Sequence, residues 1–300
     1  MGFLFATVAY CAWGLSPLYF RMAGFMTPLE ITAQRVLWAC LICLALLAAM
    51  GKLPLLLQAF ANKRLLRALV ITSAMMLLNW LLFVYAIDTR QVMSASLGYY
   101  INPLVAVLLG RLVLKEAVNP VQWAMLGLAA IGVSVLAIAT ASTGIWISLA
   151  IAVSWGIYAL LRKRNPVDSL VGFTVEILLP LPLMLGFLAW HGGGALGPAW
   201  NALLQADLLP VLLLLFAGMI TAIPLVAFGA GQSRLTMASM GLMQYISPTL
   251  QFLLATLLWG EVFTTSHAIA FACIWVAVGV FSFENWRRAR RAAAAAQGAG

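Results

Sequence analysis

The segment Tyr100-Ile101-Asn102-Pro103 recurs 145 residues later as Tyr245-Ile246-Ser247-Pro248. Thirteen residues past each proline stands a glutamate, Glu116 in one copy and Glu261 in the other. Self-similarity at a fixed spacing marks a repeated structural unit. The chain of 300 residues is therefore expected to consist of two related halves.

Two further pairs extend the repeat toward the N-terminus. Trp13-Gly14 corresponds to Trp155-Gly156 at a spacing of 142, and Glu30 corresponds to Glu176 at a spacing of 146. Landmarks that keep their order and nearly constant spacing indicate homologous units. The predicted organisation is a first repeat over residues 1–140, a second repeat over 141–286, and a cytoplasmic tail, basic and then Ala/Gly-rich, over 287–300.

The composition places both halves in a membrane. Hydrophobic residues make up 64% of the chain and charged residues only 8%, and the mean hydropathy is +1.04. A soluble domain carries about 25% charged residues. The chain is therefore expected to be solvated mostly by lipid.

Apolar runs long enough to cross a bilayer predict an all-α integral membrane protein with ten transmembrane helices, because every backbone polar group must be satisfied within its own segment. Five spans per half is an odd number, so the second half enters the membrane from the opposite side. Such inverted repeats are typical of secondary transporters, which expose a central site alternately to each side. The predicted spans are 2–20, 30–50, 65–87, 94–114, 121–139, 144–162, 170–190, 208–231, 236–258 and 266–286.

Basic residues gather on one side of this predicted topology. With ten spans in alternation, 14 of the 17 Lys and Arg residues lie on the side of the termini, and only Arg21, Arg35 and Arg90 lie on the other. The positive-inside rule then predicts a multi-pass protein of the bacterial inner membrane with both termini in the cytoplasm. The net charge of +9 needs no nucleic-acid partner to explain it.

Signatures of enzymes and of ATP-driven pumps are missing from the sequence. It has no Walker loop, HExxH motif, nucleophile elbow or metal-binding cysteine pair. We therefore expect no enzyme activity, no cofactor and no metal site.

Several motifs resemble the drug/metabolite transporter superfamily, specifically its EamA-type, RarD-like permeases. They are Asn79-Trp80-Leu81-Leu82-Phe83, the segment 94–104 with Tyr99-Tyr100-Ile101-Asn102-Pro103, and Gln244-Tyr245-Ile246-Ser247-Pro248-Thr249 followed by Gly260-Glu261. Lys115-Glu116 departs from the Gly-Glu of the second half. The resemblance implies ten spans, no ATP-hydrolysing domain, peripheral fifth and tenth helices, and a central cavity lined by helices 1, 3, 4, 6, 8 and 9.

Aromatic side chains with polar atoms are candidates for the wall of a substrate cavity. Trp13 and Trp155 are predicted near mid-span, where an interfacial role is poor. Aromatic walls suit flat, amphipathic or cationic solutes. The alternative is packing between helices. The candidates are Trp13, Trp80, Tyr99, Tyr100, Trp155, Tyr158 and Tyr245.

Amides within apolar spans are further cavity candidates, namely Asn79, Asn102 and Gln244. In lipid such groups are unfavourable, whereas in a cavity or against another helix they hydrogen-bond. Pro103 and Pro248 are predicted to kink their helices and free a backbone carbonyl. Kinking with only local satisfaction of these groups is the alternative.

Three charged residues are candidates for coupling or gating. Glu176 lies inside a predicted span, where a carboxylate must pair, face water or take up a proton; it is the first candidate for proton coupling. The alternative is a buried carboxylate paired with Arg35 or a Trp N–H. Arg35 is a candidate for contacting substrate or gating the outer side, and Glu30, in a first helical turn, for gating or for plain capping.

The two glutamates that follow the repeated prolines have a structural interpretation. Glu116 and Glu261 are expected to satisfy the N-terminal amides of the helices that directly follow them, 121–139 and 266–286.

The sequence therefore predicts a secondary-active small-molecule permease, working in the lipid bilayer as a monomer or homodimer. Export of an amphipathic metabolite or drug by alternating access is favoured, with protons as the candidate coupling ion. The alternatives are an uncoupled facilitator or importer, and a lipid-moving or non-transporting membrane scaffold.

Overall fold

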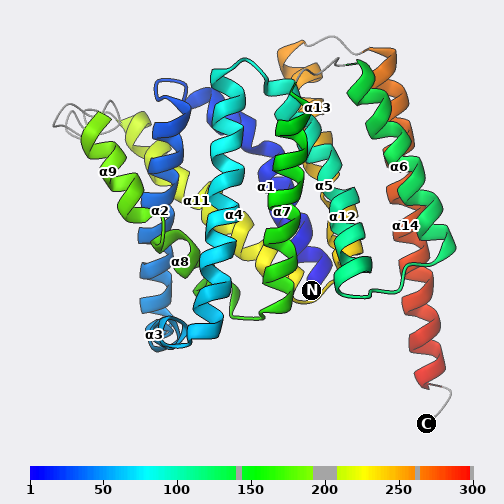
Figure 1. The fold of residues 1–300 in the computed structure, drawn as a ribbon, viewed down its shortest axis with the longest axis horizontal. Helices are drawn as coiled ribbons and strands as arrows, with labels where there is room; N and C mark the ends of the chain where they lie inside the picture. Colours follow the sequence, from blue (N-terminus) through cyan, green and yellow to red (C-terminus); the bar gives the residue numbers. More distant parts are fainter. Residues whose placement is uncertain (140–143, 192–207, 261–263, 298–300) are drawn as a thin grey trace.

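The computed structural model describes residues 1–139, 144–191, 208–260 and 264–297, and these residues form helices and no strand. Most helix axes run in roughly one direction and build a bundle (Figure 1). The helices are α1 (Gly2–Met22), α2 (Pro28–Ala49), α3 (Leu53–Ala61), α4 (Lys63–Asp88), α5 (Val92–Val113), α6 (Pro120–Ala139), α7 (Ile145–Arg164), α8 (Ser169–Leu178), α9 (Leu181–His191), α11 (Leu208–Gln232), α12 (Met237–Met243), α13 (Ile246–Trp259) and α14 (Thr265–Gln297).

Each of the ten predicted spans coincides with one helix or with two consecutive helices. Among the described residues, seven helices are long and apolar enough to cross a membrane, and the bent pair α8–α9 is an eighth candidate. The apolar part of α14, Thr265–Val280, is shorter. The chain is thus an all-helical membrane protein, and the number of ten crossings stays a prediction.

Two predicted spans are broken by their prolines. The chain bends by 42° between α8 and α9, where Pro180 has no N–H to continue the helix. The span 236–258 divides at Gln244 into α12 and α13. Pro248, in the first turn of α13, cannot donate to the carbonyl of Gln244, which instead accepts from Ser247 N at 3.1 Å. Pro103, in contrast, lies inside the uninterrupted α5.

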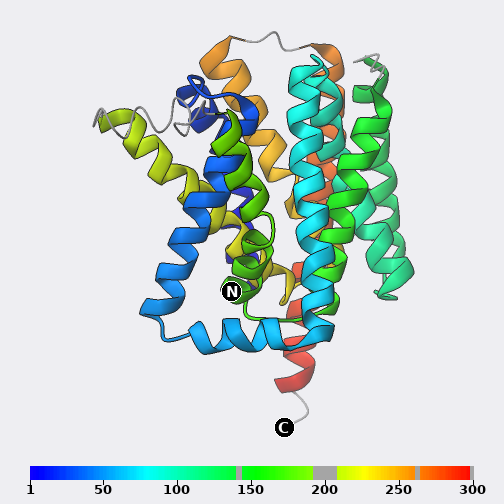
Figure 2. The same ribbon diagram turned by 60° about the vertical axis from the view of Figure 1, so that its left-hand side comes forward.

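Helix α3 was not expected from the sequence. It lies crosswise at one end of the bundle, between α2 and α4 (Figure 2). The last helix is also longer than the predicted span: α14 continues to Gln297, through the basic segment and the alanines. Alanine and arginine are among the strongest helix formers, which explains the extension.

Helix packing repeats when the two halves are exchanged. Helices α4 and α5 pack on α7, while α11 and α13 pack on α1. Helices α6 and α14 pack on each other at the edge of the bundle (Figure 1). The candidate site lies where α1 and α7 meet.

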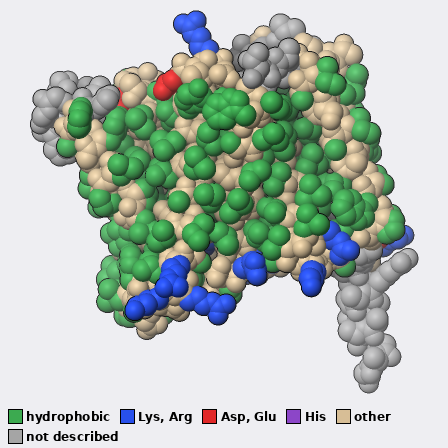
Figure 3. All heavy atoms as spheres, in the orientation of Figure 1, with side chains coloured by type: hydrophobic (Ala, Val, Ile, Leu, Met, Phe, Trp, Pro, Cys, Tyr) green, Lys and Arg blue, Asp and Glu red, His purple; other side chains and the backbone are tan. Residues whose placement is uncertain are grey.

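The surface shows the charge asymmetry of the sequence directly. Hydrophobic side chains cover the middle of the face in Figure 3, and Lys and Arg side chains gather at the lower edge, the end at which α3 lies. Both termini point toward that same end (Figure 1).

Candidate functional site

Five aromatic rings meet where the two halves come together. This central aromatic cluster consists of Tyr10 and Trp13 on α1, Trp155 and Tyr158 on α7, and Phe228 on α11. Trp13 and Trp155, equivalent positions of the predicted repeat, touch edge to face with ring centroids 5.3 Å apart. Trp155 stacks on Tyr158 at 5.0 Å, and Phe228 lies 5.1 to 6.3 Å from the other four rings. Three of the five were predicted; Tyr10 and Phe228 were not.

A proline frees the backbone carbonyl of Trp13. Pro17 on α1 has no N–H for the carbonyl of Trp13, four residues earlier. That carbonyl instead accepts from Ser16 Oγ at 2.7 Å and from Gln251 Nε2 on α13 at 3.1 Å. The freed carbonyl therefore ties the middle of α1 to the other half of the chain.

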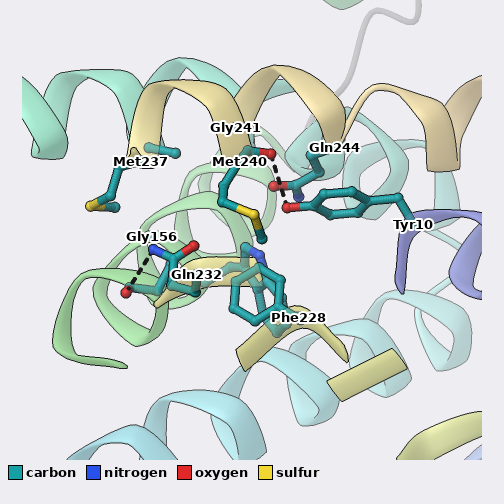
Figure 4. Close-up of a pocket in the computed structure, with 11 residues that line it drawn as sticks. Tyr10, Gly156, Phe228, Gln232, Met237, Met240, Gly241 and Gln244 are labelled. Carbon is teal, nitrogen blue, oxygen red and sulfur yellow. Dashed lines mark hydrogen bonds between the residues drawn. The ribbon is translucent and has the colours of Figure 1, made fainter. Parts of the chain in front are cut away.

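A small cavity adjoins the cluster (Figure 4). Its volume is about 10 Å³, room for about one water molecule. Tyr10 Oη donates to Met240 O at 2.9 Å, and Gln232 Nε2 donates to Ala159 O at 3.1 Å. Gln244, a predicted cavity residue, lines it as well. A solute larger than water can enter here only if the surrounding side chains move.

Glu176 on α8 is fully buried beside the cluster. Its Oε1 accepts from Thr72 Oγ1 on α4 at 2.6 Å, and its Oε2 accepts from Tyr158 Oη at 3.2 Å. Arg162 Nη1 lies 3.7 Å from Oε1. The paired carboxylate of the alternative interpretation is thus present, but its partner is Arg162 and not Arg35. Helix α2 also packs on α8, but Arg35 on α2 bonds to Thr221 on α11 instead.

Arg162 is a site residue that the sequence interpretation missed. It was counted with the cytoplasmic basic residues, yet its side chain is only 4% exposed. Two glycines make room for it: a Cβ on Gly172 would collide with Nη1, and one on Gly229 would lie 2.8 Å from Nη2. The available signal was helical spacing, since Trp155, Tyr158 and Arg162 are three and then four residues apart and share one face of α7.

Arg35 lies apart from this ion pair. Its Nε donates to Thr221 Oγ1 on α11 at 2.8 Å. Its guanidinium carbon lies 4.8 Å from the ring centroid of Trp80 and 5.5 Å from that of Phe20. Trp80, a predicted cavity residue, is therefore the platform of a cation–π contact.

Asn79 connects two helices. Its Nδ2 donates to Ile151 O at 2.9 Å and to Ser154 Oγ at 3.1 Å, both on α7. These bonds hold α4 against α7. The role of Asn79 in a substrate cavity stays a prediction. The ring centroid of Tyr99 lies 6.1 Å from that of Phe83.

Tyr100 and Tyr245 belong to a second core away from the central cluster. Both pack with residues of α6 and α14, and Tyr100 lies 6.1 Å from Phe271. Tyr245 Oη has no hydrogen-bond partner among the described residues, and the same holds for both amide atoms of Asn102, which is 1% exposed. The structure therefore does not bring these three predicted residues together with Trp13 and Trp155.

The glutamates at helix ends act as caps. Glu30 forms a capping box with Thr27, accepting from Thr27 N at 2.8 Å; its gating role remains a prediction. The expectation for Glu116 was wrong in its target: it accepts from Met237 N at 2.9 Å and so caps α12 rather than α6. The N-terminus of α6 is instead closed by a reciprocal pair of bonds between Asn119 and Gln122. Glu261 lies outside the described residues.

Known proteins resemble this chain along nearly its whole length. Residues 1–138 match the model of the EamA-like transporter family. An uncharacterized transporter of Vibrio cholerae is 38% identical over 294 residues, covering 97% of this chain and 96% of its own. Protein RarD of Escherichia coli is 33% identical over 290 residues, with 97% and 96% covered.

Two further comparisons complete this picture. The chloramphenicol-sensitive protein RarD of Pseudomonas aeruginosa is 34% identical over 296 residues, covering 97% of each chain. One solved structure superposes with a TM-score of 0.69 at 20% identity, covering 93% of this chain and 96% of that one, which shows a shared fold. The matches to relatives at 33–38% identity over nearly the full length show that the chain belongs to the EamA-like transporter family, in its RarD-like group.

Proposed function

We propose that the protein is a secondary-active permease that exports an amphipathic small molecule by alternating access, with proton movement coupled at Glu176. The observation that carries the proposal is the bond from Tyr158 to Glu176. Tyr158 is at once a member of the central aromatic cluster and a hydrogen-bond donor to the buried carboxylate. Tyr158 thus connects the aromatic rings that would contact a solute to a carboxylate that can take up a proton.

The link gives coupling a physical route. A solute that packs on the rings and holds Tyr158 against Glu176 strengthens this hydrogen bond and favours the ionised carboxylate. Solute binding and proton uptake then oppose each other, as export in exchange for protons requires. Protonation weakens the attraction between Glu176 and Arg162 in return. Coupling of two binding events through a shared group is reciprocal, so proton uptake changes the affinity for solute by the same factor.

Alternating access fits an inverted repeat, which we propose as the architecture of the whole chain. The support is the packing of α4 and α5 on α7 against that of α11 and α13 on α1, and the direct contact of Trp13 with Trp155. A cavity of about 10 Å³ would correspond to the occluded stage of such a cycle. Residence in the inner membrane with both termini in the cytoplasm belongs to the same proposal.

The first experiment finds a solute. A thermal-shift screen of metabolites and antibiotics against the purified protein identifies ligands, because a compound that binds only the folded state raises its apparent stability. Chloramphenicol belongs in the screen, since one relative is named a chloramphenicol-sensitive protein. A screen in which no compound raises the unfolding temperature would count against a soluble substrate and favour the scaffold or lipid-moving alternative.

The decisive experiment measures transport of the identified solute in proteoliposomes with an imposed pH gradient. Wild type is expected to accumulate solute against its gradient, which excludes an uncoupled facilitator, and the side of accumulation separates export from import. Glu176→Gln is expected to lose gradient-driven accumulation while keeping solute exchange. Full gradient-driven transport by Glu176→Gln would remove Glu176 from coupling.

Two control variants keep this test specific. Glu116→Gln changes a carboxylate that caps α12, outside the cluster, and is expected to transport like wild type. The double variant Arg162→Gln/Glu176→Gln removes both buried charges, because Glu176→Gln alone leaves Arg162 without its partner. Loss of coupling in both the single and the double variant would separate the loss of the carboxylate from a folding defect.

A further inference from the structure

Arg35 is a partly buried cation without an acidic partner among the described residues. It lies seven residues into α2, about 10 Å from the start of that helix. Among the described residues, no carboxylate lies within 4 Å of it. Ionisable side chains inside membrane helices are costly and mark binding or transport pathways. The positive charge of Arg35 therefore calls for a negative group that the described part of the chain does not supply.

The protein fixes the orientation of this guanidinium and leaves its outer nitrogens free. Thr221 Oγ1 accepts from Nε at 2.8 Å, and Thr221 is itself held by a bond to Ala217 O at 2.8 Å. The rings of Trp80 and Phe20 lie beside the guanidinium carbon. Nη1 and Nη2 have no hydrogen-bond partner among the described residues, and these two nitrogens form the fork that binds a carboxylate with two parallel bonds.

A second unused donor lies next to this arrangement. Tyr19 is 3% exposed, and its hydroxyl has no hydrogen-bond partner among the described residues. Its ring contacts that of Phe20 at 5.5 Å, the ring that Arg35 overlies, and Tyr19 packs in one core with Ala217, whose carbonyl holds Thr221. A buried hydroxyl without a partner is unfavourable, so Tyr19 and Arg35 share the same unmet need for an acceptor.

We propose that Arg35 and Tyr19 form the recognition site for the carboxylate of an amphipathic organic anion. A single carboxylate supplies one negative charge and two acceptor oxygens, which matches one guanidinium fork and one phenol. The surrounding rings of Phe20, Trp80 and Phe216 receive the apolar part of the solute. The inference rests on the proposed transport function and names its substrate class.

The site has a defined place relative to the central aromatic cluster. Thr221, which holds Arg35, and Phe228 of the cluster are seven residues apart on α11, which is two helical turns or about 10 Å. A carboxylate on Arg35 therefore lies toward the N-terminal end of α2, and the central cluster lies deeper along α11. In this proposal the solute passes the Arg35 site and the central aromatic cluster in turn.

The test is equilibrium binding of radiolabelled phenylacetate to the purified, detergent-solubilised full-length protein. Phenylacetamide and phenethylamine serve as competitors that keep the ring and replace the carboxylate by a neutral or a cationic group. Wild type is expected to bind phenylacetate, and neither competitor is expected to displace it. Arg35→Gln is expected to weaken binding about tenfold or more, and Arg35→Lys to recover only part of it, because lysine lacks the fork.

Control variants separate binding from folding. Arg234 also overlies a ring, that of Phe5 at 5.2 Å, and Arg234→Gln is expected to bind like wild type. Tyr19→Phe removes a hydroxyl that bonds to nothing in the described protein, so it is expected to keep the unfolding temperature while weakening phenylacetate binding. Unchanged binding by Arg35→Gln, absence of binding by wild type, or equal displacement by phenylacetamide would each overturn the proposal.

A lipid headgroup is the competing occupant. If phosphatidylglycerol vesicles displace phenylacetate and stabilise wild type but not Arg35→Gln, the site binds lipid and the proposal is wrong. Binding at equilibrium requires no gradient, so its failure leaves the proteoliposome result standing. Conversely, phenylacetate binding without any transport would contradict the proposed function and keep the site.

Discussion

Arg162 and Arg35 lie in one helix bundle but have different partners for their positive charge. Arg162 faces a buried carboxylate at 3.7 Å and lies between two glycines. Arg35 has a neutral hydroxyl and two ring faces. Removing one member of a buried pair costs about 3–5 kcal/mol, so Arg162 depends on Glu176. Arg35 has no carboxylate partner among the described residues, and we propose that a ligand supplies one.

Two buried tyrosines provide a matched test of hydrogen bonding at the residue scale. Tyr10 and Tyr245 are each 1% exposed. Tyr10 donates to Met240 O at 2.9 Å, whereas Tyr245 has no hydrogen-bond partner among the described residues. Tyr10→Phe is expected to reduce the free energy of unfolding by about 1 kcal/mol. Tyr245→Phe is expected to leave it unchanged or to raise it. Thermal unfolding in detergent measures both, and an equal loss in the two variants would contradict the assigned bond.

At the scale of elements, the side chain of Arg162 on α7 reaches the space between α8 and α11 because Gly172 and Gly229 leave room for it. Gly172→Ala is expected to push Arg162 away from Glu176 and to reduce the free energy of unfolding by about 1–3 kcal/mol. A lower unfolding temperature measures this loss. Gly127→Ala on α6 is the control, because nothing lies within 4 Å of its Cβ position; alanine there is expected to stabilise the helix by up to about 1 kcal/mol. A similar change in both variants would argue against the packing described.

Asp168 joins two elements outside the predicted spans. It caps α8 through Leu170 N at 3.0 Å and Val171 N at 3.2 Å, and it pairs with Lys52 at 2.7 Å, just before α3. Partial burial acts to raise the pKa of Asp168, but the bonds from Lys52 and from the two N–H groups outweigh it and hold the pKa below its ordinary value of 3.8. The charged contribution is therefore present above pH 3.8 and lost as the pH falls through the lowered pKa.

Two substitutions separate the contributions of Asp168. Asp168→Asn keeps a cap acceptor and loses the charge, so it is expected to cost less than about 1 kcal/mol, as exposed ion pairs do. Asp168→Ala loses the cap as well and is expected to cost about 1 kcal/mol more. Unfolding midpoints at neutral pH measure the difference. Equal midpoints for the two variants would show that the cap contributes nothing.

For the whole molecule, the two ends of α4 test the orientation in the membrane. In a variant without the four native cysteines, Lys63→Cys and Asp88→Cys place thiols at exposed first and last residues of one helix. A membrane-impermeant maleimide is expected to label Asp88→Cys in intact cells and Lys63→Cys only after permeabilisation. The reverse labelling would invert the predicted orientation, and labelling of both thiols in intact cells would show that α4 does not span the membrane.

Sequence reasoning reached the elements of the fold because apolar runs and prolines act locally. It placed all ten apolar segments on helices, and it named both Trp13 and Trp155, which the structure brings into contact. It missed α3, which has only nine residues and so resembles a loop in a search for spans. The membership in the EamA-like family, inferred from the motifs, is confirmed by the relatives.

The site was less accessible because its partners come from distant parts of the chain. Arg162 stands in the run Arg162-Lys163-Arg164, which has the composition of a surface anchor, and only the fold shows that its first member turns inward. Thr72 and Glu176 are 104 residues apart and meet through the packing of α4 on α8. Hydropathy cannot identify such pairs, since each residue alone looks like an isolated polar group.

The contact between Trp13 and Trp155 also gives the protein a built-in optical reporter. Two indoles held edge to face at 5.3 Å couple their electronic transitions, and the near-ultraviolet circular dichroism of such a pair depends on the angle between the rings. Any solute that separates the two halves at this point changes that signal, without an attached label. The ring pair at the centre of the molecule would then report each opening of the permease as a change in its spectrum.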